Sequence, residues 1–160
     1  MAAPQKLVNV AWWAVYLAVG LGLQLHFPGV DALIPGIMLS CQERQPQQTF
    51  WLCLIAILIQ EGTGSLAFGS SLLWYGSLLL FFSLGRLFFV TGSLFFVVLI
   101  AAVLGLTHSA LLYVTSSLQG FQVDTYRLAE QAMAQALLIP PLYAVASLFR
   151  KRFLDYEYGI

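Results

Sequence analysis

The sequence predicts an all-α integral membrane protein, a compact bundle of about six transmembrane helices. Of its 160 residues, 60% are hydrophobic and only 9% are charged, whereas a soluble domain carries roughly 25% charged residues. The mean hydropathy is +0.85, and the apolar residues come in runs close to the roughly 20 residues that a spanning helix needs. Because no stretch has the composition of a soluble domain, residues 1–160 are expected to form a single polytopic domain.

The first two predicted spans lie in the N-terminal quarter. The run Leu7–Phe27 exceeds the roughly 7–15 apolar residues of a signal peptide, and no small-residue cleavage pattern ends it. It is therefore expected to remain as a helix. The second span is the weakest, because it is short and contains Pro35 and Gly36.

The apolar run Phe50–Phe89 is too long for one crossing and must fold back. The Gly69–Ser71 segment is the expected turn, since a turn at Gly62–Ser65 would leave a preceding helix of only about a dozen residues, too short to cross. The predicted spans are 8–25, 27–41, 50–68, 72–89, 92–114 and 129–149.

The distribution of basic residues predicts the orientation. Six spans with a cytoplasmic N-terminus place only Arg127 outside. A re-entrant second span, with an external N-terminus, would instead leave five basic residues inside and two outside. The positive-inside rule favours six spans with both termini in the cytoplasm. The residues then expected inside are Lys6, Arg44, Arg86, Arg150, Lys151 and Arg152.

Glu61 is the most conspicuous charge, because Arg86 is the only other one in the run Phe50–Phe89. In the predicted third span it lies about 16 Å from the cytoplasmic end, near the bilayer midplane, where a carboxyl group is costly unless it is paired. A structural or partner-contact role is favoured over a proton or solute site, and His108 is the expected internal partner. The polar or partner-contact candidates are Glu61, Gly62, Gly64, Ser65, Gly69 and His108.

Small residues recur every four positions on the last two predicted spans. Such stripes let helices approach closely in lipid, and they are interpreted here as core packing. Pro140-Pro141 removes two backbone donors and is expected to kink the last helix. The packing candidates are Ala101, Gly105 and Ser109, then Ala132, Ala136 and Pro140.

Several chemistries find no support in the sequence. Neither an activated serine arrangement nor a phosphate-cradling loop is present, so no enzymatic activity is expected. Cys41 and Cys53 lack the spacing of a metal site, and neither a metal nor a cofactor is predicted. Without a basic cluster with interleaved aromatics, nucleic-acid binding is not expected.

The segment that begins at Glu61 resembles the rod-shape-determining MreD family of the bacterial inner membrane. Members carry a carboxylate, a small residue four positions later, and Leu-Gly seven and eight positions later before an apolar helix. The corresponding residues here are Glu61, Ser65, Phe68-Gly69 and Leu72-Leu73-Trp74-Tyr75. A proline-containing last helix that runs into Arg150-Lys151-Arg152 is similar as well.

The resemblance implies a non-enzymatic scaffold in the cell-elongation machinery, which determines cell shape. The implied partner is an MreC-like protein, with an MreB-like filament and peptidoglycan synthases contacted indirectly. It also implies a fold similar to the substrate-binding subunits of energy-coupling-factor transporters.

That similarity of fold leaves an alternative open: a membrane subunit that captures a vitamin or metal from outside. Such a subunit needs a pocket with convergent polar groups. His26 and Asp31 are expected to be solvated near the outer interface. The candidate polar groups are Gln24, His26, Asp31, Gln119, Gln122 and Asp124.

Overall fold

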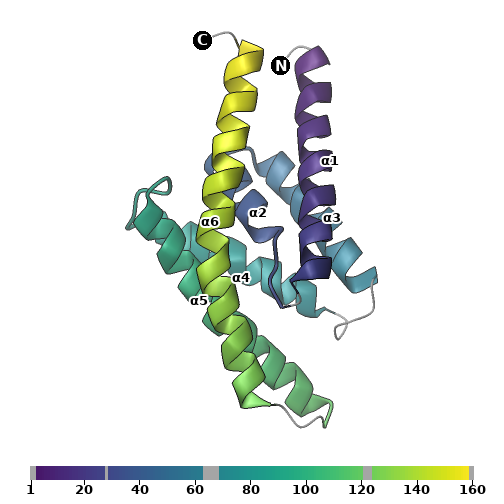
Figure 1. Cartoon of the computed structure of the whole chain (residues 1–160), viewed down its shortest axis with the longest axis vertical. Helices are drawn as coiled ribbons and strands as arrows, with labels where there is room; N and C mark the ends of the chain where they lie inside the picture. Colours follow the sequence, from purple (N-terminus) through teal and green to yellow (C-terminus); the bar gives the residue numbers. More distant parts are fainter. Residues whose placement is uncertain (1–2, 28, 63–68, 121–123, 159–160) are drawn as a thin grey trace.

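The computed structural model describes residues 3–27, 29–62, 69–120 and 124–158. This part of the chain forms six helices and no strand (Figure 1). Three segments are long and apolar enough to cross a membrane, namely 7–26, 94–118 and 125–153. The predicted class of helical membrane protein is therefore supported in outline. The helices are α1 (Ala3–His26), α2 (Ile34–Gln42), α3 (Pro46–Gly62), α4 (Ser70–Gly85), α5 (Leu94–Leu118) and α6 (Thr125–Tyr158).

The long helices α5 and α6 pack as an antiparallel pair, and the C-terminal end of α5 and the N-terminal end of α6 both lie at the bottom of Figure 1. The two helices approach each other closely at Gly105 because this residue has no side chain. A Cβ there would lie 2.6 Å from the carbonyl oxygen of Ala132. The Ser109 hydroxyl donates to the Leu128 carbonyl at 3.0 Å, which adds a polar contact between the helices. The N-terminal end of α1 and the C-terminal end of α6 lie at the same end of the molecule (Figure 1).

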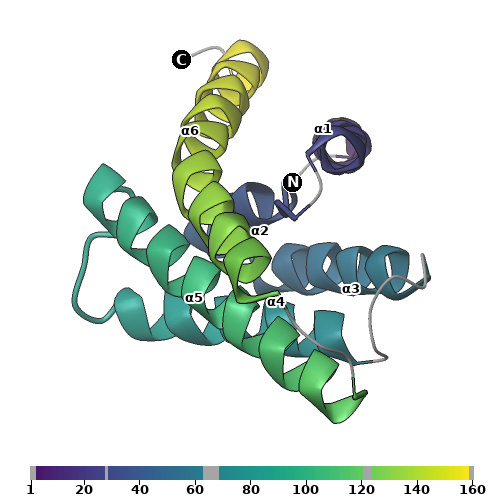
Figure 2. The ribbon, with the colours of Figure 1, turned by 60° about the horizontal axis from the view of Figure 1, so that its bottom comes forward.

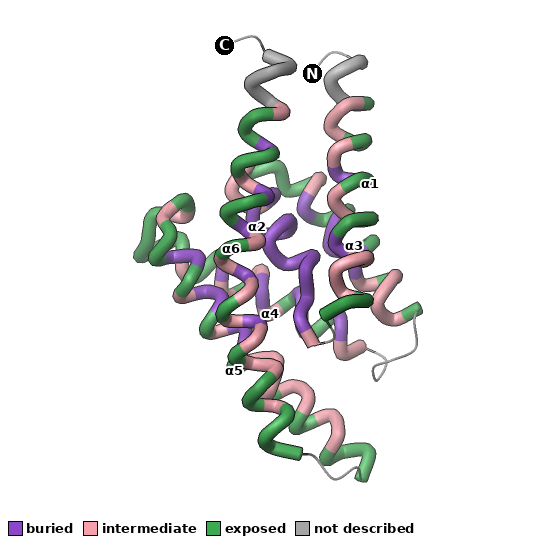
Figure 3. Tube along the Cα trace, in the orientation of Figure 1, coloured by how far each residue is buried: buried purple, intermediate pink, exposed green. Residues whose placement is uncertain are grey.

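The short helix α2 lies at the centre of the molecule, and every residue from Val30 to Ser40 is buried (Figure 3). Nine residues rise only about 14 Å, less than half of the roughly 30 Å hydrocarbon core. The expected helix over 27–41 is thus wrong in its first half, where residues 29–33 are irregular. Pro35 stands in the first turn of α2, where its missing N–H costs no hydrogen bond.

The segment that contains α2 runs antiparallel to α1. Leu33 lies against Gly20, where an added Cβ would be 2.7 Å from the Leu33 side chain. Further along, the Tyr16 ring packs against Gly36 in the space that a side chain there would fill. The Tyr16 hydroxyl donates to the Ala32 carbonyl at 2.9 Å. Because later residues of this segment meet earlier residues of α1, the chain returns toward the N-terminal end of α1.

Helix α3 begins at Pro46 and ends at Gly62, six residues before the predicted end. The predicted continuation over 63–68 lies outside the described residues. Glycine is among the poorest helix formers, and the sequence Gly62-Thr63-Gly64-Ser65 therefore favours a break that the apolar run length concealed. Helix α4 follows from Gly69, whose φ of 88° lies in the left-handed region that suits glycine.

The remaining helix boundaries also differ from those predicted. Helix α4 ends at Gly85, and α5 continues to Leu118, four residues past its predicted end. Helix α6 runs from Thr125 to Tyr158 through Pro140 and Pro141 without interruption, and Figure 2 shows a curved course rather than a break. Its 34 residues span about 51 Å, so α6 extends well beyond a hydrocarbon core.

Large apolar side chains cover much of the outer surface, as the exposed positions in Figure 3 show. On α1, Leu7, Val10 and Leu25 are 75%, 66% and 85% exposed. A soluble monomer rarely exposes apolar patches on this scale, whereas a helix in lipid faces hydrocarbon. The burial pattern therefore agrees with the composition.

Candidate functional site: a buried carboxylate beside a polar cavity

Asp31, in the irregular segment before α2, is the most heavily hydrogen-bonded side chain of the described structure. It is only 5% exposed. Its Oδ1 accepts from Gln24 Nε2 at 2.6 Å and from the backbone N–H of Leu33 at 2.9 Å. The donors to Oδ2 are Gln60 Nε2 at 3.2 Å, Trp74 Nε1 at 3.0 Å and the Tyr75 hydroxyl at 2.7 Å.

These donors come from α1, α3, α4 and the turn into α2, so Asp31 joins four parts of the chain. All five donors are neutral. A buried carboxylate is tolerated when donors satisfy its lone pairs, and five hydrogen bonds do so here. The sequence-based expectation that Asp31 is solvated at the outer interface is therefore wrong.

A cavity of about 320 Å³ opens beside Asp31. Amide, hydroxyl and imidazole groups line it together with apolar side chains. This mixture of a mostly apolar wall with a few placed polar groups is typical of small-molecule sites. The lining residues include Asp31, Ser70, Trp74, His108, Leu111, Leu112, Thr115 and Gln135.

His108 lies on the wall of this cavity, on α5. Its ring packs edge-on against Trp74, with centroids 4.9 Å apart. Trp74 in turn donates to Asp31, so His108 is one side chain removed from the carboxylate. The predicted partner of His108 was Glu61, which does not line the cavity.

Glu61 lies at the C-terminal end of α3, half-buried, and not at the middle of a spanning helix. Its Oε1 accepts the backbone N–H of Gly69 at 2.9 Å. The carboxylate therefore bridges the two ends of the α3–α4 connection. The predicted continuous helix over 50–68 is not found around Glu61, because α3 ends one residue later; its midplane position stays a prediction.

The glycine and serine candidates beside Glu61 have different outcomes. Gly62 is exposed, and a Cβ there would meet nothing within 4 Å, so no close helix approach uses it in the described structure. Gly69 is the N-cap residue of α4 and has a positive φ. Gly64 and Ser65 lie outside the described residues.

The packing candidates lie on the antiparallel pair α5 and α6. Ala101 and Gly105 are buried, and Ser109 is half-buried. On α6, the candidates Ala132, Ala136 and Pro140 are all half-buried. At Gly105 an added methyl group would clash with the backbone of Ala132.

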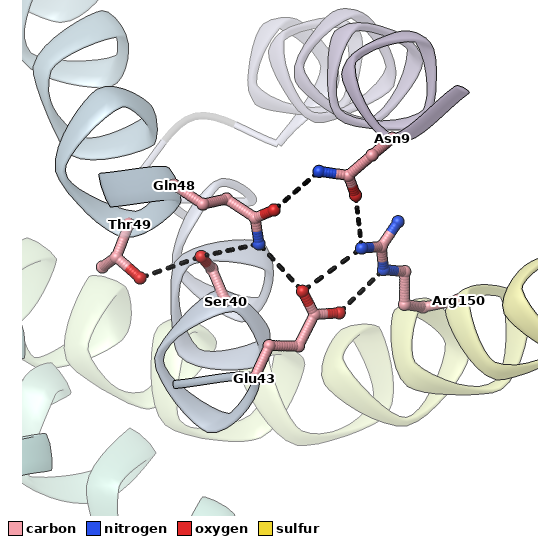
Figure 4. Close-up of polar contacts among 6 residues, drawn as sticks. All are labelled: Asn9, Ser40, Glu43, Gln48, Thr49 and Arg150. Atoms are coloured by element: carbon pink, nitrogen blue, oxygen red, sulfur yellow. Dashed lines mark hydrogen bonds and ion pairs between the residues drawn. The ribbon is translucent and has the colours of Figure 1, made fainter. Parts of the chain in front are cut away.

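A second polar cluster, shown in Figure 4, lies toward the termini and was not predicted. Arg150 on α6 donates from Nε to Glu43 Oε1 at 2.7 Å and from Nη2 to Glu43 Oε2 at 3.2 Å. It also donates to Asn9 on α1, while Gln48 on α3 bonds both Asn9 and Glu43. Two tryptophans flank the guanidinium, with Trp12 centred 4.8 Å from Cζ. This cluster ties α1, α3 and α6 to the end of α2.

The other polar residues considered for an external pocket separate into two groups. Gln24 and Asp31 reach the cavity. His26, Gln119 and Asp124 are exposed, and Gln122 lies outside the described residues. Gln60 and Gln135 were not predicted as site residues. The signal that could have identified them is a glutamine inside an apolar helix, because such a side chain needs a buried hydrogen-bond partner.

Comparison of the chain with protein-family models, with curated proteins and with solved structures gave no match. The class that the fold defines is a helical membrane protein with a buried carboxylate and an adjoining cavity.

Proposed function

We propose that this chain is a non-enzymatic scaffold subunit of the bacterial cell-elongation machinery that binds an MreC-like partner. Support comes from the segment that carries the resemblance. The Glu61 carboxylate accepts the N–H of Gly69, which is the N-cap residue of α4. Five and six residues further on, Trp74 and Tyr75 both donate to Asp31. Four residues of the motif, Glu61, Gly69, Trp74 and Tyr75, thus make hydrogen bonds that connect separate segments of the chain, which supports a structural role for the motif.

The proposed topology is an inner-membrane bundle with six crossings and both termini in the cytoplasm, similar to the substrate-binding subunits of energy-coupling-factor transporters. Residues 27–41 would make the second crossing, because α2 and the described residues just before it run antiparallel to α1, and Glu43 just after it joins the cluster that contains Asn9. The same end holds Arg44 and Arg150, and Gln42 bonds Thr91 in the turn after α4. Basic residues gathered at one end favour a cytoplasmic position for it.

The test is recovery of partners. The tagged chain is solubilised in mild detergent, and co-purifying proteins are identified by mass spectrometry. We expect an MreC-like protein, with an unrelated tagged protein of similar size as the control. Recovery of ATPase subunits without an MreC-like protein would overturn the proposal.

Glu61→Gln is the matched variant for this experiment. An amide oxygen can still accept the Gly69 N–H, so both the fold and the recovery of the partner are expected to persist. If a folded Glu61→Gln protein loses the partner, the charge itself takes part in the contact.

The second candidate is a subunit that captures a solute, and the cavity beside Asp31 is the observation that favours it. Recovery of ATPase subunits in the same experiment would support it. Recovery of only the MreC-like protein would count against it.

A further inference from the structure

Two residues that line the cavity, Gln135 and Ser70, each carry a buried side-chain oxygen without a hydrogen-bond partner among the described residues, namely Gln135 Oε1 and Ser70 Oγ. Gln135 is fully buried, and its Nε2 donates to the Gly29 carbonyl at 3.1 Å. Because a carbonyl accepts only from the NH₂ end, this bond fixes the amide and leaves Oε1 as the unpaired atom. An unpaired buried acceptor keeps its full desolvation penalty, so Gln135 calls for a donor from whatever fills the cavity.

The charge of the cavity indicates what kind of donor fits. Asp31 is held only by neutral groups in the contacts described above, and the described lining contains no Lys or Arg. A neutral occupant could satisfy Gln135, whereas a cation would also place a positive charge near Asp31, whose described hydrogen bonds come from neutral donors, and charges attract strongly at low dielectric constant. A cation with N–H donors can both donate to Gln135 and supply a positive charge near Asp31.

The walls indicate an organic cation rather than a coordinated metal ion. Within the described residues, no three His, Cys, Asp or Glu side chains form a metal-binding group. The cavity volume of about 320 Å³ is at the lower end of the range for small-molecule sites. Trp74, Leu111 and Leu112 provide an apolar wall, and an aromatic ring adds attraction for a nearby ammonium group.

We propose that the cavity beside Asp31 binds a small organic ammonium ion. Its N–H group donates to Gln135 Oε1, Asp31 supplies the opposite charge, and the apolar body of the ligand lies against Trp74 and the two leucines. The inference gives a ligand class to the second candidate function and does not rest on the scaffold function.

The probe is benzylamine, which is protonated at neutral pH, and its neutral analogue benzyl alcohol is the matched control. Binding to the purified full chain in detergent is measured by titration calorimetry, with empty micelles as the blank. We expect saturable binding of benzylamine that is tighter than that of the alcohol by about tenfold or more, as for a charged hydrogen bond. Equal affinity for both, or no signal above the micelle blank, would overturn the proposal.

Two variants locate the site. Gln135→Met removes the acceptor at similar volume, and Asp31→Asn removes the charge; each is expected to weaken benzylamine binding by about tenfold. Thr115→Val is the control, since Thr115 lines the cavity but donates its hydroxyl to Leu111 of its own helix at 2.8 Å. If Asp31→Asn fails to fold, Gln135→Met decides, and unchanged affinity in that variant refutes the site. Binding without recovery of ATPase subunits would leave the site standing and remove only the transporter role.

Discussion

The ion pair between Arg150 and Glu43 makes a sharp prediction about stability. The Arg150 and Glu43 side chains are only 4% and 18% exposed, and Nε lies 2.7 Å from Oε1. The bidentate geometry and the adjacent Trp12 and Trp13 rings hold the guanidinium in place. Arg150→Met removes the cation but keeps most of the apolar stem that packs on these rings.

The expected loss of stability in Arg150→Met follows from the Glu43 charge that remains without its partner. Removing one partner of a buried ion pair typically costs about 3–5 kcal/mol, because the other charge stays buried. Glu43 retains some exposure and one further donor, Gln48 Nε2 at 2.8 Å, so the lower end, about 3 kcal/mol, applies. The double variant Arg150→Met/Glu43→Met leaves no buried charge and is expected to lie within about 1.5 kcal/mol of the wild type.

The assay is SDS-induced unfolding in detergent micelles, followed by tryptophan fluorescence. The control is Arg127→Met, which breaks an exposed pair with Asp124 whose atoms are 3.7 Å apart and should change stability by no more than about 0.5 kcal/mol. If Arg150→Met costs no more than this control, or if the double variant is the least stable, the assignment of a buried, coupled pair is refuted.

Two further predictions concern close helix contacts. Gly105→Ala places a methyl group 2.6 Å from the Ala132 backbone and should lower the free energy of unfolding by about 1–3 kcal/mol, whereas Gly76→Ala, which meets nothing within 4 Å, should raise it by about 0.5–1 kcal/mol. Gly36→Ala should displace the Tyr16 ring and lower the free energy of unfolding by more than Tyr16→Phe does, since Tyr16→Phe removes one hydrogen bond worth about 1 kcal/mol. Thermal unfolding of the four purified variants checks both predictions. Equal stability of Gly105→Ala and Gly76→Ala, or of Gly36→Ala and Tyr16→Phe, would contradict the packing described.

Much of the fold could be predicted from run length and composition. The long helices α1, α5 and α6 each coincide with a mostly apolar stretch long enough to cross a membrane, so their existence could be predicted and only their ends differ. Helices α2 and α3 were harder, because the expectation of full-length spans outweighed local signals. Pro35 marks the first turn of α2, and Gly62 marks the end of α3; both are local signals that the sequence contains.

The candidate site could not be predicted in the same way. Gln24, Gln60, Trp74 and Tyr75, which donate to Asp31, lie 7 to 44 residues away along the chain. Nothing in their spacing shows that they meet. What the sequence does contain is the requirement: each buried polar side chain in an apolar helix must find a partner. That requirement identifies which side chains need a hydrogen-bond partner, while only the three-dimensional arrangement shows which residue the partner is.

The two polar clusters flank α2 and explain how so short a helix is held in place. Asp31 lies just before α2 and Glu43 forms its C-cap, and the donors to these carboxylates come from α1, α3, α4 and α6. Apolar contact alone positions a helix poorly in lipid, since lipid tails are as apolar as the side chains. Hydrogen bonds to a buried carboxylate are directional and costly to break there. The two clusters therefore fix both ends of α2, and the cluster around Asp31 also holds the segment before α2 that lines the cavity.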